Sequence, residues 1–194
     1  MSENPIATAE RPHVQRLGRI WLWAVVGLVM AAVIGLPVYV WPPSDSFAHA
    51  DVAYVIGPPT RERVSLAERL LAEGVVDAVL VSVPERGGQS ARQLSVCARD
   101  DVTCETPEPL TTKGEVALLT EYRRSHPADR VIVITFAPHV ARTRYIFETC
   151  YSGEVATTAA PTRLDAAEWA YQYVYQTAAF VKAAMTACSS TTAD

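Results

Sequence analysis

The stretch Arg130–Thr149 reads RVIVITFAPHVARTRYIFET and joins a predicted strand to a predicted helix. Its first part, Arg130–Thr135, is an apolar run rich in β-branched residues, which is typical of a strand buried on both faces. Pro138 then stands in the first turn of the predicted helix Pro138–Thr149, where its missing N–H leaves no hydrogen bond unmade. A buried strand that leads into a helix is the building unit of a parallel α/β sheet.

The chain after residue 50 repeats this alternation of strands and helices. Further strands are predicted over short apolar runs that end near turn residues: Asp51–Gly57, Asp77–Val83, Val155–Thr158 and a short one near Val102–Cys104. Further helices are predicted over segments with apolar residues at helical spacing: Arg61–Glu73, Thr112–His126 and Asp165–Ala187. The pattern predicts an α/β fold, a Rossmann-like three-layer parallel sheet with a strand order of about 3-2-1-4-5.

The last predicted helix carries three aromatic residues at helical spacing, Trp169, Tyr173 and Phe180. Such a stripe is more often part of a core than a ligand-binding surface. We therefore expect this helix to bury its aromatic face.

The predicted strand order indicates where a ligand would bind. In open parallel sheets, ligands bind outside the carboxyl ends of the strands, at the point where the strand order reverses. For the order 3-2-1-4-5, this point lies between Asp51–Gly57 and Arg130–Thr135. We therefore expect the loops 57–61 and 136–139 to face each other and to carry the site.

Ahead of this domain, the stretch Ile20–Val40 is apolar and uncharged. About 20 such residues cross a bilayer as a helix. Arginines precede the stretch and aspartates follow it, which favours a cytoplasmic N-terminus in the plasma membrane. Aromatic residues that favour lipid headgroups stand near its two ends: Trp21, Trp23, Tyr39 and Trp41. The expected organisation is a cytoplasmic tail (1–19), a single transmembrane helix (20–41), a linker (42–50) and an extracytoplasmic α/β domain (51–194).

A cleaved signal peptide is the alternative interpretation of the apolar stretch. Ala48-His49-Ala50 resembles a small-x-small cleavage site. The apolar run is longer than the usual signal core of about 7–15 residues, and the cut would fall well beyond its end. These features favour a retained anchor, and both interpretations place the domain outside the cytoplasm.

Charge and cysteine content indicate what kind of domain this is. The chain has 17 basic and 21 acidic residues and a net charge of −4, unlike the basic domains that bind nucleic acid. All four cysteines follow the apolar stretch, and an even number in an exported domain favours disulfides. Of the possible pairings we favour Cys97–Cys104 and Cys150–Cys188. The histidines are scattered and no Cys-x-x-Cys occurs, so we expect no metal site.

His139 and Arg142 stand at the start of a predicted helix and, three residues apart, share one face. The backbone N–H groups and the dipole of a helix N-terminus attract anions. The same positive end disfavours an imidazolium, so we expect a neutral His139 that is suited to general-base chemistry. The pair predicts a pocket for phosphate or carboxylate, with a capping histidine and a surface arginine as the alternative. Arg144 is expected to point to solvent.

The motif Thr112-Lys113-Gly114-Glu115 opens another predicted helix. Its spacing matches a capping box, in which Thr112 caps the helix and Glu115 reaches back to the cap. In the functional alternative, Glu115 points into the crevice as a partner for His139 or for a ligand cation. Gly114 is unfavourable in a first helical turn, which indicates that another segment comes close there.

Other positions at the strand ends are candidates for ligand binding. Arg61 or Arg63, after the first strand, could bind an anion through two guanidinium nitrogens, and a solvated first turn is the alternative. Ser82 ends the second strand, where its hydroxyl could bind a ligand or only cap the loop. The sequence contains no nucleotide-binding phosphate loop and no G-x-S-x-G motif, and we expect no cofactor.

Several of these segments resemble the YdcF/SanA/ElyC-like family, a group of bacterial envelope domains of unknown function. The resemblance runs from about Asp51 to Val155, and its most specific parts are the H-x-x-R after an apolar strand and the upstream T-x-x-E. It is carried by DVAYVIG (51–57), DAVLVSV (77–83), PEPLTTKGE (107–115) and VIVITFAPHVARTRYIF (131–147). The sequence departs from the family pattern at Pro58-Pro59 and Val83-Pro84, where many members have glycines.

The resemblance implies a Rossmann-like fold, an N-terminal membrane anchor and a role in the cell envelope, such as barrier integrity or surface-polysaccharide metabolism. By motif match, it implies that Glu115 and His139 are the candidate catalytic residues. The ligand-binding positions that it implies are Gly57, Arg63, Ser82, Thr112 and Arg142.

Two functional hypotheses follow from the residues and the resemblance. In the first, a membrane-anchored envelope protein binds an anionic, phosphorylated cell-wall or lipid-linked precursor, with Arg63 and Arg142 as anion clamps. In the second, the domain is a non-catalytic interaction module whose His/Arg/Glu cluster is structural. A methyltransferase-like cofactor binder is a weaker third hypothesis, because an extracytoplasmic domain has no evident supply of such a cofactor.

Overall fold

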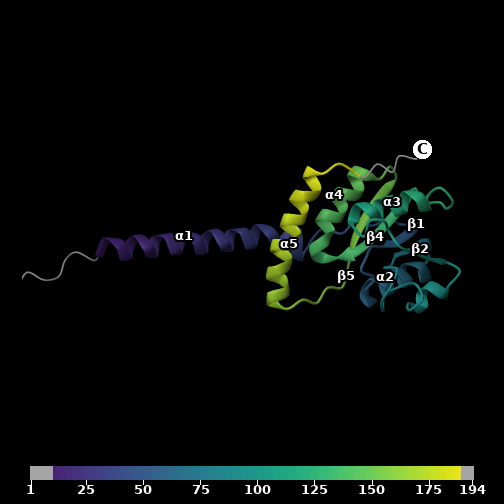
Figure 1. Ribbon diagram of the computed structural model, residues 1–194, viewed down its shortest axis with the longest axis horizontal. Helices are drawn as coiled ribbons and strands as arrows, with labels where there is room; N and C mark the ends of the chain where they lie inside the picture. The colour runs from purple at the N-terminus through teal and green to yellow at the C-terminus, as the bar shows by residue number, and fades with distance from the viewer. Residues whose placement is uncertain (1–10, 189–194) are drawn as a thin grey trace, which may run out of the picture. The chain divides into compact units, whose positions relative to one another are not determined.

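The structure is a computed structural model that describes residues 11–188 (Figure 1). The chain divides into two compact units, Met1–Leu36 and Pro37–Asp194. The first part of the predicted tail, residues 1–10, lies outside the described residues.

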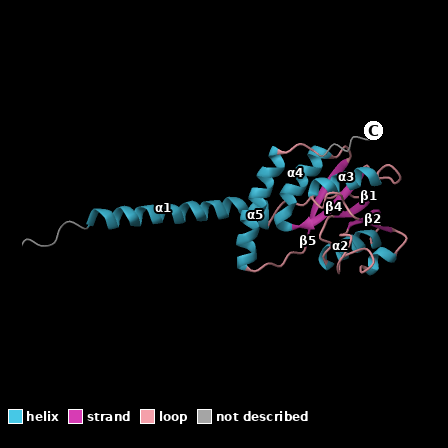
Figure 2. Cartoon of the chain, viewed as in Figure 1, coloured by secondary structure: helices cyan, strands magenta, loops and turns pink. Residues whose placement is uncertain are grey.

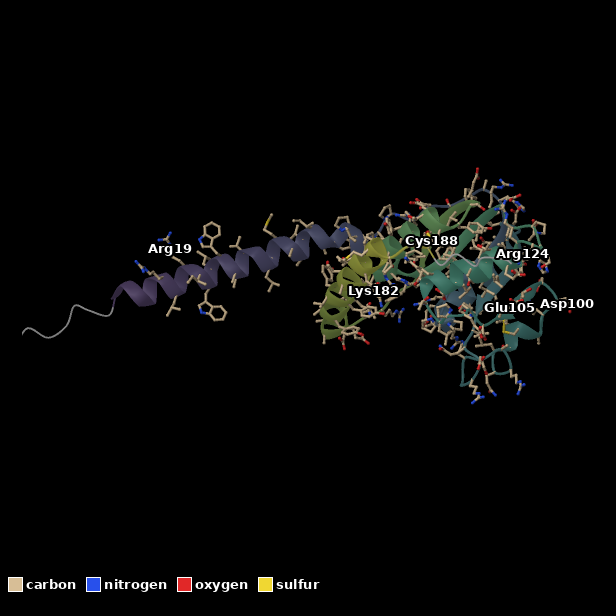
Figure 3. The ribbon with its side chains drawn as sticks, turned by 45° about the horizontal axis from the view of Figure 1, so that its top comes forward. Arg19, Asp100, Glu105, Arg124, Lys182 and Cys188 are labelled. Carbon is tan, nitrogen blue, oxygen red and sulfur yellow. A yellow bond between two sulfur atoms is a disulfide. The ribbon has the colours of Figure 1, made fainter. Side chains whose placement is uncertain are left out.

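The described part of the first unit is one long helix, α1 (Arg11–Gly35), and Leu36. The π-helical turn η1 (Leu36–Val40) begins at Leu36 and continues into the second unit. The helix begins well ahead of the predicted start at Ile20, because Pro12 fits a first helical turn and no further proline occurs before η1. Figure 3 labels Arg19 on α1, just before the apolar stretch. The helical segment Arg16–Val40 is long and apolar enough to cross a membrane.

The second unit contains a five-stranded sheet of order β3-β2-β1-β4-β5, in which all neighbouring strands are parallel. This arrangement confirms the predicted fold class and strand order. Figure 2 shows the strands in magenta between the cyan helices. The strands are β1 (Ala50–Val55), β2 (Val76–Ser82), β3 (Val102–Glu105), β4 (Arg130–Phe136) and β5 (Glu154–Ala160).

The helices of this unit follow the predicted ones with shifted ends. They are α2 (Arg61–Ala72), η2 (Ser95–Ala98), α3 (Thr112–Tyr122), η3 (Ala137–His139), α4 (Val140–Cys150) and α5 (Ala166–Met185). The predicted helix Pro138–Thr149 begins as the 3-10 turn η3 and continues as α4. His139 therefore lies where the 3-10 helix ends and the α-helix begins.

Each face of the sheet has its own core, because residues alternate along β1. Val52 and Tyr54 pack with the apolar side chains of α3 and α4. Ala53 and Val55, on the opposite face, pack with Ala67 of α2 and with neighbouring strand residues. The unit is therefore a three-layer sandwich with helices on both faces of the sheet.

Helix α5 packs mainly against α4 and η3. Only Gln176 and Ala183 of this helix are buried. Trp169, Tyr173 and Phe180 are half-buried, so the predicted burial of the aromatic face is only partly correct. The reason is that α3 and α4 already cover this face of the sheet, which leaves α5 as an outer helix.

The structure contains both predicted disulfides, Cys97–Cys104 and Cys150–Cys188. The second one ties the end of α4 to the segment after α5. The segment that follows η1 is also attached to the domain. Arg144, which we expected to point to solvent, forms a 2.7 Å ion pair with Asp45 and donates to the carbonyl of Pro43.

Candidate functional site

A cavity of about 750 Å³ opens at the carboxyl ends of the strands, beside the adjacent strands β1 and β4. This is the place that the strand order predicted for a ligand. The cavity is lined by six of the seven site residues expected from the sequence: Gly57, Ser82, Thr112, Glu115, His139 and Arg142. Arg63 is not part of the lining.

Glu115 is 5% exposed and belongs to the first turn of α3. Its carboxylate oxygen Oε1 accepts a 2.5 Å hydrogen bond from the backbone N–H of Gly57, after β1. The predicted capping box is wrong, because Thr111 is the cap and its hydroxyl accepts from the N–H of Gly114. Because the helix cap lies one residue earlier than predicted, the side chains of Thr112 and Glu115 are not used for capping and line the cavity.

Burial raises the pKa of Glu115 to about 7, although several neighbours oppose this change. The hydrogen bonds from Gly57 and Ser82 favour the carboxylate, as do the positive charges of nearby arginines. Burial is the largest effect, so the carboxyl group exchanges its proton near neutral pH. A group with such a pKa is suited to general acid/base chemistry.

Two glycines allow the segments of this wall to approach one another. A Cβ at Gly114 would lie 1.9 Å from the carbonyl oxygen of Pro109. A Cβ at Gly57 would lie 3.2 Å from Oε1 of Glu115 and 3.3 Å from the hydroxyl of Ser82. The close approach that the sequence indicated at Gly114 is therefore present.

His139 is 5% exposed, and threonine hydroxyls lie beside both of its ring nitrogens. Nδ1 is 2.9 Å from the hydroxyl of Thr135, and Nε2 is 3.4 Å from that of Thr112. Burial, reinforced by the charges of Arg142 and Arg63, lowers the pKa of His139 well below its ordinary value. The imidazole is thus neutral, as expected from the sequence.

Glu115 and His139 line one cavity, but they do not form the predicted carboxylate–imidazole pair among the described residues. The backbone of Gly57 holds the carboxyl group, and Thr135 and Thr112 hold the ring. The two groups bond to different segments. Glu115 accepts from the turn after β1, whereas His139 bonds to β4 and to the first turn of α3.

Arg142 extends from the first turn of α4 towards α5. Its Nε donates a 3.0 Å hydrogen bond to the amide oxygen of Gln176, which is 1% exposed. The amide nitrogen of Gln176 donates in turn to Gln172. Only the Nε of the guanidinium has a hydrogen-bond partner among residues 16–188, so its terminal nitrogens remain available to a ligand.

Arg63 does not line the cavity where the anion clamp was predicted, because its side chain is turned towards the backbone. The buried guanidinium donates to the carbonyls of Ile56 and Pro58 and lies 4.9 Å from the ring centroid of Phe136. Burial lowers its pKa to about 10, so Arg63 remains charged at neutral pH. It stabilises the turn after β1 that carries Gly57. The other candidate, Arg61, is exposed.

Several residues of the site were not predicted from the sequence. They are Thr135 beside His139, Gln176 beside Arg142, and Lys113, Tyr175 and Lys182 in the cavity lining. Lys113 bonds the end of α5, where its Nζ is 2.7 Å from both the hydroxyl of Thr186 and the carbonyl of Ala187. Thr135 lies in β4, four residues before His139, and this proximity in the sequence was the one available signal.

The charged groups of the cavity make it suitable for an anion. Among the described lining residues, the positive side chains are Lys113, Arg142 and Lys182, and Glu115 is the only carboxyl group. Because the pKa of Glu115 is near 7 and His139 is neutral, positive charge predominates at neutral pH. Within the described residues, no group of His, Cys, Asp and Glu side chains is suited to hold a metal ion.

Comparisons of the chain with family models, with curated proteins and with solved structures found no match.

Proposed function

We propose that this chain is a membrane-anchored protein of the YdcF/SanA/ElyC-like type whose extracytoplasmic cavity binds an anionic, phosphorylated cell-wall or lipid-linked precursor. In this proposal, α1 and η1 cross the plasma membrane with the N-terminus in the cytoplasm. The domain then contributes to the integrity or biogenesis of the envelope. Two disulfides in the domain support an oxidising location outside the cytoplasm.

The observation that carries the proposal is the guanidinium of Arg142, oriented by Gln176 at the edge of a cavity with one carboxyl group. Arginine binds phosphate through parallel N–H groups, and a partly desolvated site strengthens that contact. The protonated form of Glu115 can donate a hydrogen bond to a phosphate oxygen. In the proposed site, Glu115 and His139 serve as acid/base or orienting groups.

The walls of the cavity support an amphipathic ligand. Apolar side chains line it beside the charged ones, including Pro59, Leu110, Phe136 and Ile146. Leu110 is 66% exposed, although it is a large apolar residue. A ligand that joins a phosphate to an apolar chain would satisfy both kinds of wall.

Titration calorimetry tests the proposal with the full-length chain in nanodiscs, using a short isoprenyl phosphate and a nucleotide sugar as probes. We expect the wild type to bind one of the two probes. Arg142→Ala should weaken binding about tenfold or more, because it removes a charge-assisted contact. Arg124→Ala removes the same charge from an exposed ion pair with Glu121 and is the matched control. No binding by the wild type, or equal binding by both variants, would contradict the proposal.

A specific observation favours the second hypothesis, a non-catalytic interaction module. Both ring nitrogens of His139 and one carboxylate oxygen of Glu115 already have partners within the protein. Thermal melting of His139→Gln and Glu115→Gln separates the two hypotheses. A large loss of stability would favour a structural cluster, whereas normal stability with a lost envelope phenotype favours a binding site.

A further inference from the structure

The outward face of α5 is apolar and carries no charged side chain. It consists of Tyr171, Val174, Ala178, Val181 and Met185, which recur at helical spacing. The side chains of Val174 and Met185 are 73% and 80% exposed. A continuous apolar stripe of this kind on an outer helix indicates a surface that another apolar medium covers.

The two sides of α5 that flank this face have different neighbours. On one side, the hydroxyl of Tyr39 lies 2.7 Å from that of Thr177, and its ring packs edge-on against Tyr173 with centroids 5.0 Å apart. On the other side, Tyr175 and Lys182 line the cavity. Residues on a helix advance by 100° each, so the outward face runs between the Tyr39 contact and the cavity mouth.

Tyr39 is the second-last residue of the candidate membrane span Arg16–Val40, and it belongs to the second unit, Pro37–Asp194. Its contacts with Thr177 and Tyr173 attach the end of the span to the side of α5 that flanks the outward face. The chain that follows is attached as well. Asp45 pairs with Arg144, and its backbone N–H donates to the carbonyl of Thr157. Contacts of Tyr39 and Asp45 therefore hold the segment ahead of β1 against the domain.

We propose that the outward face of α5 lies in the headgroup region of the bilayer that the apolar stretch crosses, so that the cavity opens at the membrane surface. This inference rests on the proposed membrane anchoring. Tyrosines concentrate at membrane interfaces, and a helix with one apolar face lies in the plane of the interface. The Tyr39 contact favours lipid over a second protein, because it ties α5 to the residues where the span ends.

The placement identifies the ligand of the proposed site as a lipid phosphate that enters from the bilayer. Figure 3 labels Lys182 on α5, and this residue borders both the outward face and the cavity. At the level of the headgroups, its ammonium group meets the phosphates of lipids before the more deeply placed Arg142 does. The exposed apolar side chain of Leu110 at the cavity would then contact the lipid chain.

Photo-crosslinking tests the placement with the full-length chain in vesicles of phosphatidylethanolamine and phosphatidylglycerol. Val174 is replaced by p-benzoylphenylalanine, and the same replacement at exposed Arg124 is the control. We expect about tenfold more lipid adduct from position 174, because an interfacial residue contacts acyl chains that a solvated one does not reach. Mass spectrometry of the products identifies lipid adducts and crosslinked protein.

The outcomes separate this inference from the proposed function. Vesicle flotation first shows whether the chain is anchored, and failure to float would contradict the anchoring itself. If the chain floats but position 174 gives a crosslinked dimer, another protein or no lipid adduct, the placement of α5 is wrong and the anchoring stands. Lipid adducts at position 174 in a chain that binds no isoprenyl phosphate would support the placement and contradict the proposed ligand.

A second variant tests the route of the ligand. The double change Val174→Asp and Val181→Asp puts charge on the outward face and leaves the cavity lining intact. We expect weaker capture of a long-chain polyprenyl phosphate embedded in vesicles and unchanged binding of a short, soluble isoprenyl phosphate. Equal capture of the embedded lipid by wild type and variant would overturn the proposed route.

Discussion

The two walls of the cavity are held in place by different means. The inner wall consists of Gly57, Ser82, Glu115 and His139, which lie at or just after the carboxyl ends of strands or in the first turn of a helix. The outer wall consists of the cavity-lining residues of α5, among them Tyr175, Gln176, Lys182 and Ala183. The inner-wall residues other than Gly57 are 5% exposed or less, whereas Gln176 and Ala183 are the only buried residues that α5 contributes to the outer wall.

Different interactions position the two walls. Backbone hydrogen bonds of the parallel sheet fix the inner wall, and its polar groups are bound within a few residues of a strand end. The outer wall depends on contacts between side chains and on the covalent bond between Cys150 and Cys188. We therefore expect changes to the disulfide to loosen α5 and leave the sheet edge intact.

Among the variants considered, the double change Cys150→Ser and Cys188→Ser should lower the free energy of unfolding most. The sequence separation of 38 residues corresponds to about 4 kcal/mol of unfolding free energy in the chain-entropy account. Hydrogen exchange should rise most in α5, and denaturant titration should give the loss of stability. The double change Cys97→Ser and Cys104→Ser should cost less, because it opens a shorter loop. Unchanged exchange in α5 would show that the disulfide does not hold the outer wall.

The inner wall is sensitive to the close approach at Gly114. The change Gly114→Ala places a Cβ 1.9 Å from the carbonyl oxygen of Pro109, and a backbone atom cannot move away cheaply. We expect a loss of about 3 kcal/mol, at the upper end of overpacking effects. Gly88→Ala meets nothing within 4 Å and is the control for denaturant unfolding. Equal stability of the two variants would contradict the packing of the inner wall.

The pH dependence of stability reports on the buried carboxyl group of the inner wall. Because the folded state raises the pKa of Glu115 from 4.5 to about 7, the wild type loses stability as the pH rises through this range. Glu115→Gln lacks this loss. The difference in unfolding free energy between Glu115→Gln and the wild type should therefore shift by about 3 kcal/mol in favour of the variant from about pH 5 to pH 8. The control Glu148→Gln changes an exposed carboxyl group. If the difference in unfolding free energy between Glu115→Gln and the wild type does not vary with pH, the raised pKa of Glu115 is excluded.

A smaller effect is expected from Lys113, which joins the two walls. Lys113→Met keeps the apolar stem but removes the hydrogen bonds to Thr186 and Ala187 at the end of α5. We expect a loss of about 1 kcal/mol in thermal unfolding. Lys182→Met is the matched control, since its ammonium group has no protein partner among residues 16–188. Equal melting temperatures would show that Lys113 does not support the outer wall.

The inner wall could be predicted from the sequence because strand order decides it. Once β1 and β4 are placed side by side, Gly57 and His139 must meet at one edge of the sheet. The cap at Thr111 rather than Thr112 could not be predicted, because both threonines have suitable side chains and the backbone angles decide.

The outer wall could not be predicted, because helix packing depends on which face of α5 meets α4. The aromatic spacing favoured a buried stripe, whereas the buried residue in contact with Arg142 is Gln176. Arg63 and Arg144 were also placed incorrectly. Arg63 donates to the backbone carbonyl of Ile56, and Arg144 pairs with Asp45 and donates to the carbonyl of Pro43. These contacts form only in the folded chain.

The proposed anion site is tested most directly by measuring the pKa of the Glu115 carboxyl group. NMR of the full-length chain labelled with ¹³C-glutamate gives this pKa. We predict a pKa of about 7 without ligand. Binding of a short isoprenyl phosphate should raise it further, because a phosphate nearby disfavours the carboxylate. A pKa that stays unchanged when the phosphate is added to saturation would contradict an anion site at Glu115 and Arg142.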